Sequence, residues 1–266
     1  MAHSSAVCPC DICAATPISM LKALWRSLVL ALALACSAGF AATDKFSDAQ
    51  TLGQWITYYY VQPEPQRVGE AIRAASSKGF MQNGKAAPFI GFIAGVANKS
   101  PSMAQTLAKQ FATLAKVDQP VGILGIWYSG NPEAKPLLER FLKTMPAHKA
   151  MIEHLLASVP LGLLDLPLEE GPWVLDALWG YFMATGDAAP VARIITALPW
   201  VNIRGDVPRL LVGGAARWSL ISNAIQHERV MVVCRNELAS QSADVRMVLS
   251  EVIASAEKDM KEGKTR

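Results

Sequence analysis

Cysteine and histidine are the residues of this chain best suited to bind a metal or to act as nucleophiles, and its 266 residues include five cysteines and four histidines. Three of the cysteines, Cys8, Cys10 and Cys13, are grouped in the sequence CPCDIC. Such a group is typical of a soft-metal or redox cluster, but only His3 lies near enough in the sequence to add a fourth ligand. We therefore expect leader sequence here, or sequence ahead of the true start, with a metal cluster as the alternative.

The later histidines do not have the spacing of a metal site. His148 and His154 are six residues apart, so on a helix they would point about 120° away from each other. Two metal ligands on one helix are typically four residues apart. His227 belongs to the sequence QHER at a predicted turn, where we treat it as a candidate partner-binding residue. The sequence predicts neither a metal site nor a cofactor.

Two further motifs lack residues that their chemistry requires. Gly213-Gly214-Ala215-Ala216 has the small residues of a phosphate-binding loop, but no Lys-Ser/Thr pair follows it and no predicted strand precedes it. The stretch GILGIWYS at 122–129 contains no nucleophile elbow. Small residues inside a long helix favour close packing or a kink, and we expect that role for residues 213–216.

Acidic residues near apolar helices are the remaining candidates for chemistry, namely Glu153, Glu169, Asp176 and Asp187. Two carboxyl groups held in opposed environments can act as general acid and general base. The alternative function is therefore an all-α cell-envelope hydrolase that uses paired carboxylates. Structural roles explain two of these acids, because Glu169 precedes a predicted helix, where its dipole favours negative charge, and Asp187 follows a glycine at a predicted helix end. We predict no catalytic residue.

Residues 20–41 have the three parts of a secretory signal peptide. Met20 begins a short segment with Lys22 and Arg26, an apolar core follows from Leu28, and small residues precede a cleavage site after Ala41. The core is short for a membrane anchor. We therefore expect translation to start at Met20, cleavage after Ala41, and a periplasmic or secreted product. Lipid anchoring through Cys36 is the alternative.

The composition of the whole sequence indicates a protein with a packed core. Hydrophobic residues make up 52% of the sequence and the formal net charge is +3, which disfavours disorder and gives no electrostatic reason to expect nucleic acid. After cleavage only Cys234 remains, so no intramolecular disulfide can form. Cys234 follows the apolar run VMVV, which predicts a buried structural thiol.

Helical periodicity extends along the rest of the chain, and no stretch shows the sustained alternation of a strand. We expect an all-α fold, a single domain at 42–258 and a flexible tail at 259–266. Proline, glycine and polar turns separate twelve predicted helices, at 47–60, 68–78, 89–97, 103–114, 120–128, 133–143, 147–157, 172–185, 190–198, 207–227, 230–239 and 244–258.

A repeat emerges when these helices are taken in pairs. Similar apolar sequences begin the first helix of a pair at residues 55, 89 and 123, a period of 34 residues. A helix–turn–helix unit of this length resembles the tetratricopeptide family. The unit at 178–198 is the most similar, through Leu178, Phe182, Gly186-Asp187, Val191, Ile195 and Leu198. Hairpins of similar length also recur in α-domains that contain no repeat, and this remains the alternative.

The resemblance implies stacked antiparallel hairpins in an α-solenoid, with a long helix near the C-terminus. Such arrays bind proteins or peptides, so we expect an exported helical-repeat scaffold with a protein or peptide partner, no catalytic activity and no membrane span after cleavage. Most large aromatic residues should then fill the core, namely Trp55, Phe92, Trp127, Trp179 and Trp218. The candidate partner-binding or turn-edge residues are Trp127, Tyr128, Trp179, Asp187 and His227.

Overall fold

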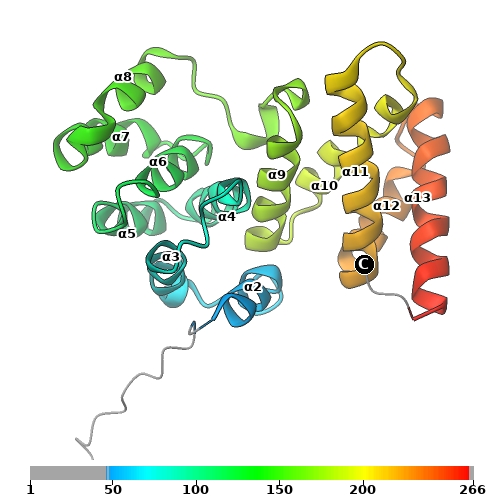
Figure 1. The fold of residues 1–266 in the computed structure, drawn as a ribbon, viewed down its shortest axis with the longest axis horizontal. Coiled ribbons are helices and arrows are strands. Elements are labelled where there is room, and N and C mark those ends of the chain that lie inside the picture. The colour runs from blue at the N-terminus through cyan, green and yellow to red at the C-terminus, as the bar shows by residue number, and fades with distance from the viewer. Residues whose placement is uncertain (1–45, 47, 264–266) are drawn as a thin grey trace, which may run out of the picture. The chain divides into compact units, whose positions relative to one another are not determined.

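The computed structural model describes residue 46 and residues 48–263 (Figure 1). The predicted signal peptide, Cys36 and the CPCDIC group lie outside the described residues. Within the described part, the chain forms α-helices and short 3-10 turns and contains no strand. The all-α prediction is confirmed.

Twelve α-helices make up most of the described part. They are α2 (Ala49–Thr57), α3 (Val68–Ser77), α4 (Ala86–Lys99), α5 (Pro101–Phe111), α6 (Gln119–Trp127), α7 (Ala134–Thr144), α8 (Lys149–Ala157), α9 (Pro172–Thr185), α10 (Ala188–Ile195), α11 (Val207–Gln226), α12 (Glu228–Glu237) and α13 (Ala243–Lys261). The 3-10 turns are η1 (Pro65–Arg67), η2 (Pro146–His148), η3 (Leu163–Asp165), η4 (Leu168–Glu170) and η5 (Leu198–Asn202).

Local signals account for several helix ends. Asp48 and Asp206 precede α2 and α11, and their carboxylates accept hydrogen bonds from the backbone N–H groups of Thr51 and Arg209 at 2.7 and 3.1 Å. Gly186 ends α9 with a φ of 66°, a left-handed conformation that glycine adopts without strain. Helix α13 runs to Lys261, so it takes in residues 259–261, which the sequence assigns to the tail.

Consecutive helices pack together as pairs. Contacts join α4 to α5, α6 to α7, α9 to α10 and α11 to α12. The first helices of neighbouring pairs also meet, α4 with α6 and α9 with α11, as do the second helices, α5 with α7 and α10 with α12. Each pair therefore covers apolar surface that its neighbour leaves open.

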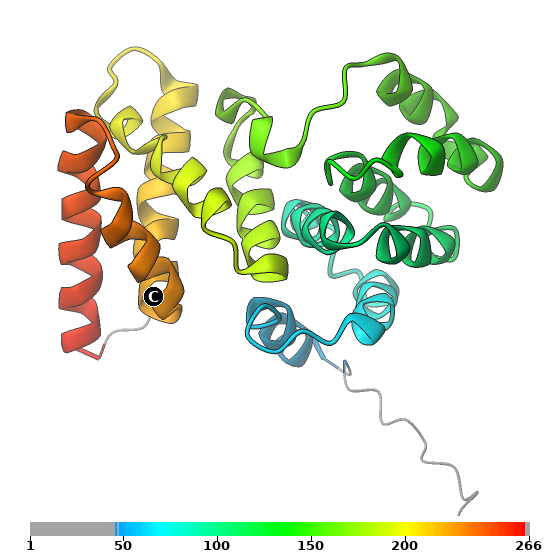
Figure 2. The same ribbon diagram turned by 180° about the vertical axis from the view of Figure 1, so that it is seen from behind.

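The closest packing in the described part is between α4 and α9, which lie side by side in Figures 1 and 2. A Cβ atom added to Gly91 would lie 1.7 Å from the carbonyl oxygen of Ala177, and one added to Gly180 would lie 1.9 Å from that of Pro88. The two backbones therefore touch, and only glycine fits at these two points. A strictly sequential stack would place α9 beside α8, whereas its most extensive contact is with α4.

The core is aromatic and aliphatic, and its five largest fully buried side chains are Phe46, Phe92, Phe111, Phe141 and Phe182. Trp127 and Trp179 are also buried. The expectation that Trp218 fills the core is wrong, because its side chain is 61% exposed. Helix α11 uses another face for packing, through Val212, Gly213, Ala216 and Leu220. Trp218 points away from that face.

None of the helices formed by the described residues combines the length and the apolar character needed to cross a membrane.

Candidate functional site

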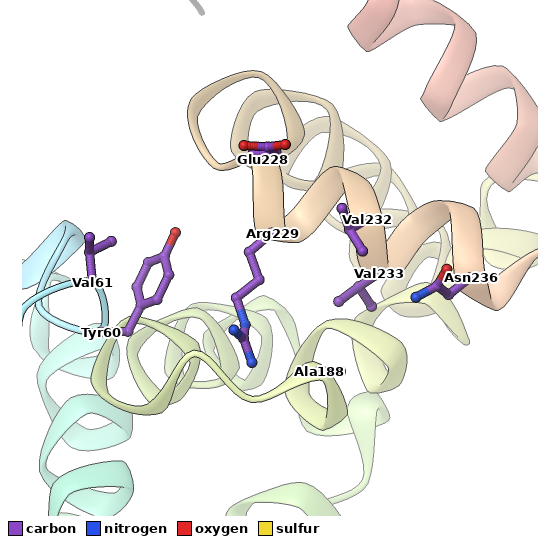
Figure 3. Close-up of a pocket in the computed structure, with 8 residues that line it drawn as sticks. All are labelled: Tyr60, Val61, Ala188, Glu228, Arg229, Val232, Val233 and Asn236. Atoms are coloured by element: carbon purple, nitrogen blue, oxygen red, sulfur yellow. The ribbon is translucent and has the colours of Figure 1, made fainter.

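A groove with a volume of about 840 Å³ runs along α12. Its walls come from the segment after α2, from the start of α10 and from α12 itself, and we call it the α12 groove (Figure 3). Its volume falls within the usual range for ligand sites in proteins. The lining residues are Tyr60, Val61, Ala188, Glu228, Arg229, Val232, Val233 and Asn236.

One face of α12 supplies half of this lining. Val232 and Val233 follow Arg229 by three and four residues, and Asn236 follows them by four and three, so the four side chains project toward the same side of the helix. Val233 is buried at the base of the groove, whereas Val232 is 45% exposed. On the opposite wall Val61 is 64% exposed. The groove therefore has apolar side chains on both walls that the described residues leave partly uncovered.

Tyr60 forms the wall opposite α12 and is held firmly against α9. Its backbone N–H donates a hydrogen bond of 3.0 Å to the carbonyl oxygen of Met183. Its ring lies 5.0 Å from that of Phe182, and a Cβ atom added to Gly186 would come within 2.8 Å of the ring. Gly186 therefore serves both to end α9 and to make room for Tyr60.

His227 lies behind this wall and joins it to α12. Its Nδ1 atom is 3.1 Å from the hydroxyl of Tyr60, and its ring lies against those of Tyr58 and Phe182 at 5.1 and 5.8 Å. The side chain is 1% exposed, and Nε2 has no hydrogen-bond partner among the described residues. Burial lowers the pKa of His227. Burial also raises the pKa of Tyr60, against the opposing effect of the positive charge of Arg229.

Glu228 and Arg229 are the two charged residues in the lining of the groove. Figure 3 shows the Arg229 side chain reaching toward the start of α10, while the Glu228 carboxylate points the other way. Among the described residues none forms an ion pair with Arg229. Asp187, next to the lining residue Ala188, is held by Lys99 at 2.9 Å. An anionic group in the groove would therefore meet a cation that no neighbour neutralises.

The structure does not bring the five predicted partner-binding residues together at one site. His227 and Asp187 lie beside the α12 groove, and Trp179 contacts Phe182 from within α9, with the rings 5.9 Å apart. Trp127 and Tyr128 lie at the end of α6, away from the groove lining. There the Tyr128 carbonyl accepts a hydrogen bond of 2.9 Å from the backbone N–H of Leu163, and the Tyr128 ring is 6.3 Å from that of Trp173.

The candidate carboxylates belong to separate ion pairs. Glu153 pairs with Lys149 at 3.6 Å, Glu169 with Arg209 at 3.0 Å and Asp187 with Lys99. Asp176 is the exception, and burial raises the pKa of its carboxyl group. Each paired acid therefore has a different cation, and the Lys149–Glu153 pair lies within α8 whereas the other two pairs connect different segments.

Metal and thiol chemistry find no support in the described part of the chain. Its residues contain no group of three or more His, Cys, Asp or Glu side chains placed to hold a metal ion. The Nε2 atom of His148 is engaged with the carbonyl oxygen of Lys116 at 3.0 Å. Cys234 is fully buried, and burial raises the pKa of its thiol to about 12. Its structure matches the buried thiol that the sequence predicts.

Sequence reasoning missed Tyr60, Val61, Arg229 and Val232. The apolar run on α12 predicts a buried helix face, because valines on one side of a helix usually face a core. It therefore gave no sign that Val232 is exposed. The run of three tyrosines at 58–60, directly before the prolines at 63 and 65, was the available signal. Aromatic residues at the end of a helix and before a constrained turn are well placed to form a fixed wall.

Comparison with known proteins assigns no role to this geometry. No family model, curated protein or solved structure matches it.

Proposed function

We propose that the mature chain is an exported helical-repeat scaffold that binds a protein or peptide partner and has no catalytic activity of its own. The α12 groove carries this proposal. It combines partly exposed valines on both walls, a fixed aromatic ring and a cation without an ion-pair partner among the described residues. Protein interfaces use the same combination, with apolar and aromatic residues at the centre and polar groups at the rim.

Tyr60 is well suited to the centre of such an interface. Its backbone is tied to α9 and its hydroxyl to His227, so the ring loses little conformational freedom when a partner binds. Val61 and Val232 would lose contact with water at the same time, and the burial of apolar surface is favourable by about 25 cal/mol per Å². Binding would thus use surface that is already organised.

A tetratricopeptide-like stack of hairpins is part of the proposal. The pairing of α9 with α10 and of α11 with α12, together with the contacts between the pairs, supports it. In the unit at 178–198 the expected packing positions Leu178, Phe182, Val191, Ile195 and Leu198 are fully buried. Hydrogen exchange would test the stack, because hairpins in such arrays open as separate units. A single opening step for all twelve helices would count against it.

Binding can be tested by selecting ligands from a display library of random peptides with the purified protein. We expect selected peptides to lose affinity for Val232→Asp, which places a negative charge among the apolar side chains of the α12 wall. Val159→Asp is the matched control, since Val159 is 77% exposed and lies outside the groove lining. If folded wild-type protein selects no peptide, or if the selected peptides bind both variants equally well, the proposal is wrong.

Export is supported by the sequence at 20–41 and has its own test. N-terminal sequencing of the protein recovered from a bacterial envelope fraction should give Ala42 as the first residue. Leu30→Arg should disrupt the apolar core and keep the protein in the cytoplasm. Lipid anchoring would instead give a chain that begins at a modified Cys36, and Cys36→Ser would then release the protein from the membrane fraction.

A further inference from the structure

Resting on the proposed function, we propose that the α12 groove selects extended peptide segments in which an acidic residue lies two positions from an apolar residue. The carboxylate pairs with the guanidinium of Arg229, and the apolar side chain packs between Val61 and Val232. Asn236 lies further along the same wall, where its amide can hydrogen-bond the peptide backbone.

The spacing of the groove residues sets the spacing in the peptide. Arg229 is three residues from Val232 and four from Val233 on α12, and side chains at these separations are about 5–6 Å apart at their Cβ atoms. In an extended chain, successive side chains alternate between faces and each residue advances about 3.3 Å. Residues two positions apart therefore share a face at about 6.6 Å, which is close to the spacing on the helix.

Charge favours an acidic ligand. Asp187, the acid that directly precedes α10, is paired with Lys99 at 2.9 Å. The Glu228 carboxylate lies on the other side of α12 from the Arg229 guanidinium (Figure 3). A ligand carboxylate could therefore pair with Arg229 without displacing an ion pair of the described residues. Arg229 is exposed to solvent, so a ligand can reach it directly, and the pair that forms is comparable to other ion pairs near a protein surface.

The experiment compares the residues enriched by different variants from one library of random peptides. Wild-type protein should enrich Asp and Glu two positions from Val, Leu or Ile. Arg229→Glu should enrich Lys or Arg at the same position, and Arg229→Gln should show no charge preference. The matched control is Arg204→Glu, because Arg204 is exposed, lies outside the groove and undergoes the same change of charge.

Affinities of individual peptides complete the test. A selected acidic peptide should bind Arg229→Glu at least about tenfold more weakly than wild-type protein, since a hydrogen-bonded charge pair is lost, and should bind Arg204→Glu normally. Circular dichroism and the thermal midpoint show that each variant is folded. If wild-type protein selects peptides without acidic enrichment, or Arg229→Glu retains the acidic preference, this inference is wrong while the proposed function stands. If wild-type protein selects no peptides, both are wrong.

Discussion

The hydroxyl of Tyr60 lies 3.1 Å from Nδ1 of His227, and this contact connects two walls of the α12 groove that are far apart in the sequence. Tyr60 follows α2, whereas His227 directly precedes α12. Because His227 is buried against Phe182 of α9 as well, three segments meet at one imidazole ring. The junction therefore connects the segment after α2 to α9 and to the start of α12.

Removal of this hydrogen bond should destabilise the protein. In Tyr60→Phe, the imidazole keeps its place but both of its nitrogen atoms lack a described partner. We expect the free energy of unfolding to fall by about 1–3 kcal/mol, the cost of leaving a buried polar group unsatisfied. Urea unfolding followed by circular dichroism measures the change. The control is Tyr58→Phe, because Tyr58 is 46% exposed and contacts His227 through its ring. Equal losses in both variants would show that the hydrogen bond contributes nothing specific.

Stability should also depend on pH through His227. Burial holds the pKa of the folded state below the ordinary value of 6.5, so the unfolded chain binds a proton at a higher pH than the folded chain. The free energy of unfolding should therefore be at its full value above pH 6.5 and should decrease as the pH falls from there toward the folded-state pKa. Urea unfolding at several pH values between about 8 and 5 measures the slope. The slope should be smaller in His227→Gln, and an unchanged slope would assign it to other groups.

Helix positions could be predicted from the sequence because their signals are local. The predicted helix at 172–185 has the same bounds as α9, since proline at the first position and glycine after the last are strong signals. The end of α10 was predicted less accurately. Pro199 lies in the 3-10 turn η5, so the helix stops at Ile195 rather than at Leu198. Proline removes a hydrogen-bond donor and ends regular α-helix a few residues early.

The α4–α9 contact and the groove could not be predicted, because both depend on distant parts of the chain. Gly91 and Gly180 have a low helix propensity, and only their contact across two helices explains why glycine is needed. Arg229 gave no local signal at all. Its role arises from its position between Tyr60 and α10, and from the pairing of Asp187 with Lys99. A single sequence shows such combinations only after the chain is folded.

Cys234 should be unreactive in the folded protein. The side chain is fully buried and its thiol has a pKa of about 12, so at pH 8 only about one thiol in ten thousand would be the nucleophilic thiolate. Iodoacetamide labelling, mapped by mass spectrometry to the peptide that contains Cys234, should be slow in native protein and fast in concentrated urea. Rapid labelling of the native protein would show that α12 opens readily. Val230→Ala, which should loosen the packing around α12, is expected to speed the native reaction.

Gly91→Ala should separate α4 from α9 and destabilise the whole described fold. The added Cβ atom would lie 1.7 Å from the backbone oxygen of Ala177, and backbone cannot move aside as a flexible side chain can. We expect a loss of about 2–3 kcal/mol, as for other overpacked sites. Gly214→Ala on α11 is the matched control, because its Cβ atom would meet nothing within 4 Å. That substitution should stabilise the protein by about 0.5–1 kcal/mol, since alanine loses less backbone entropy than glycine in a helix. Opposite signs for the two changes in urea unfolding would locate the close contact at Gly91, whereas a stabilising Gly91→Ala would show that the two helices do not touch there.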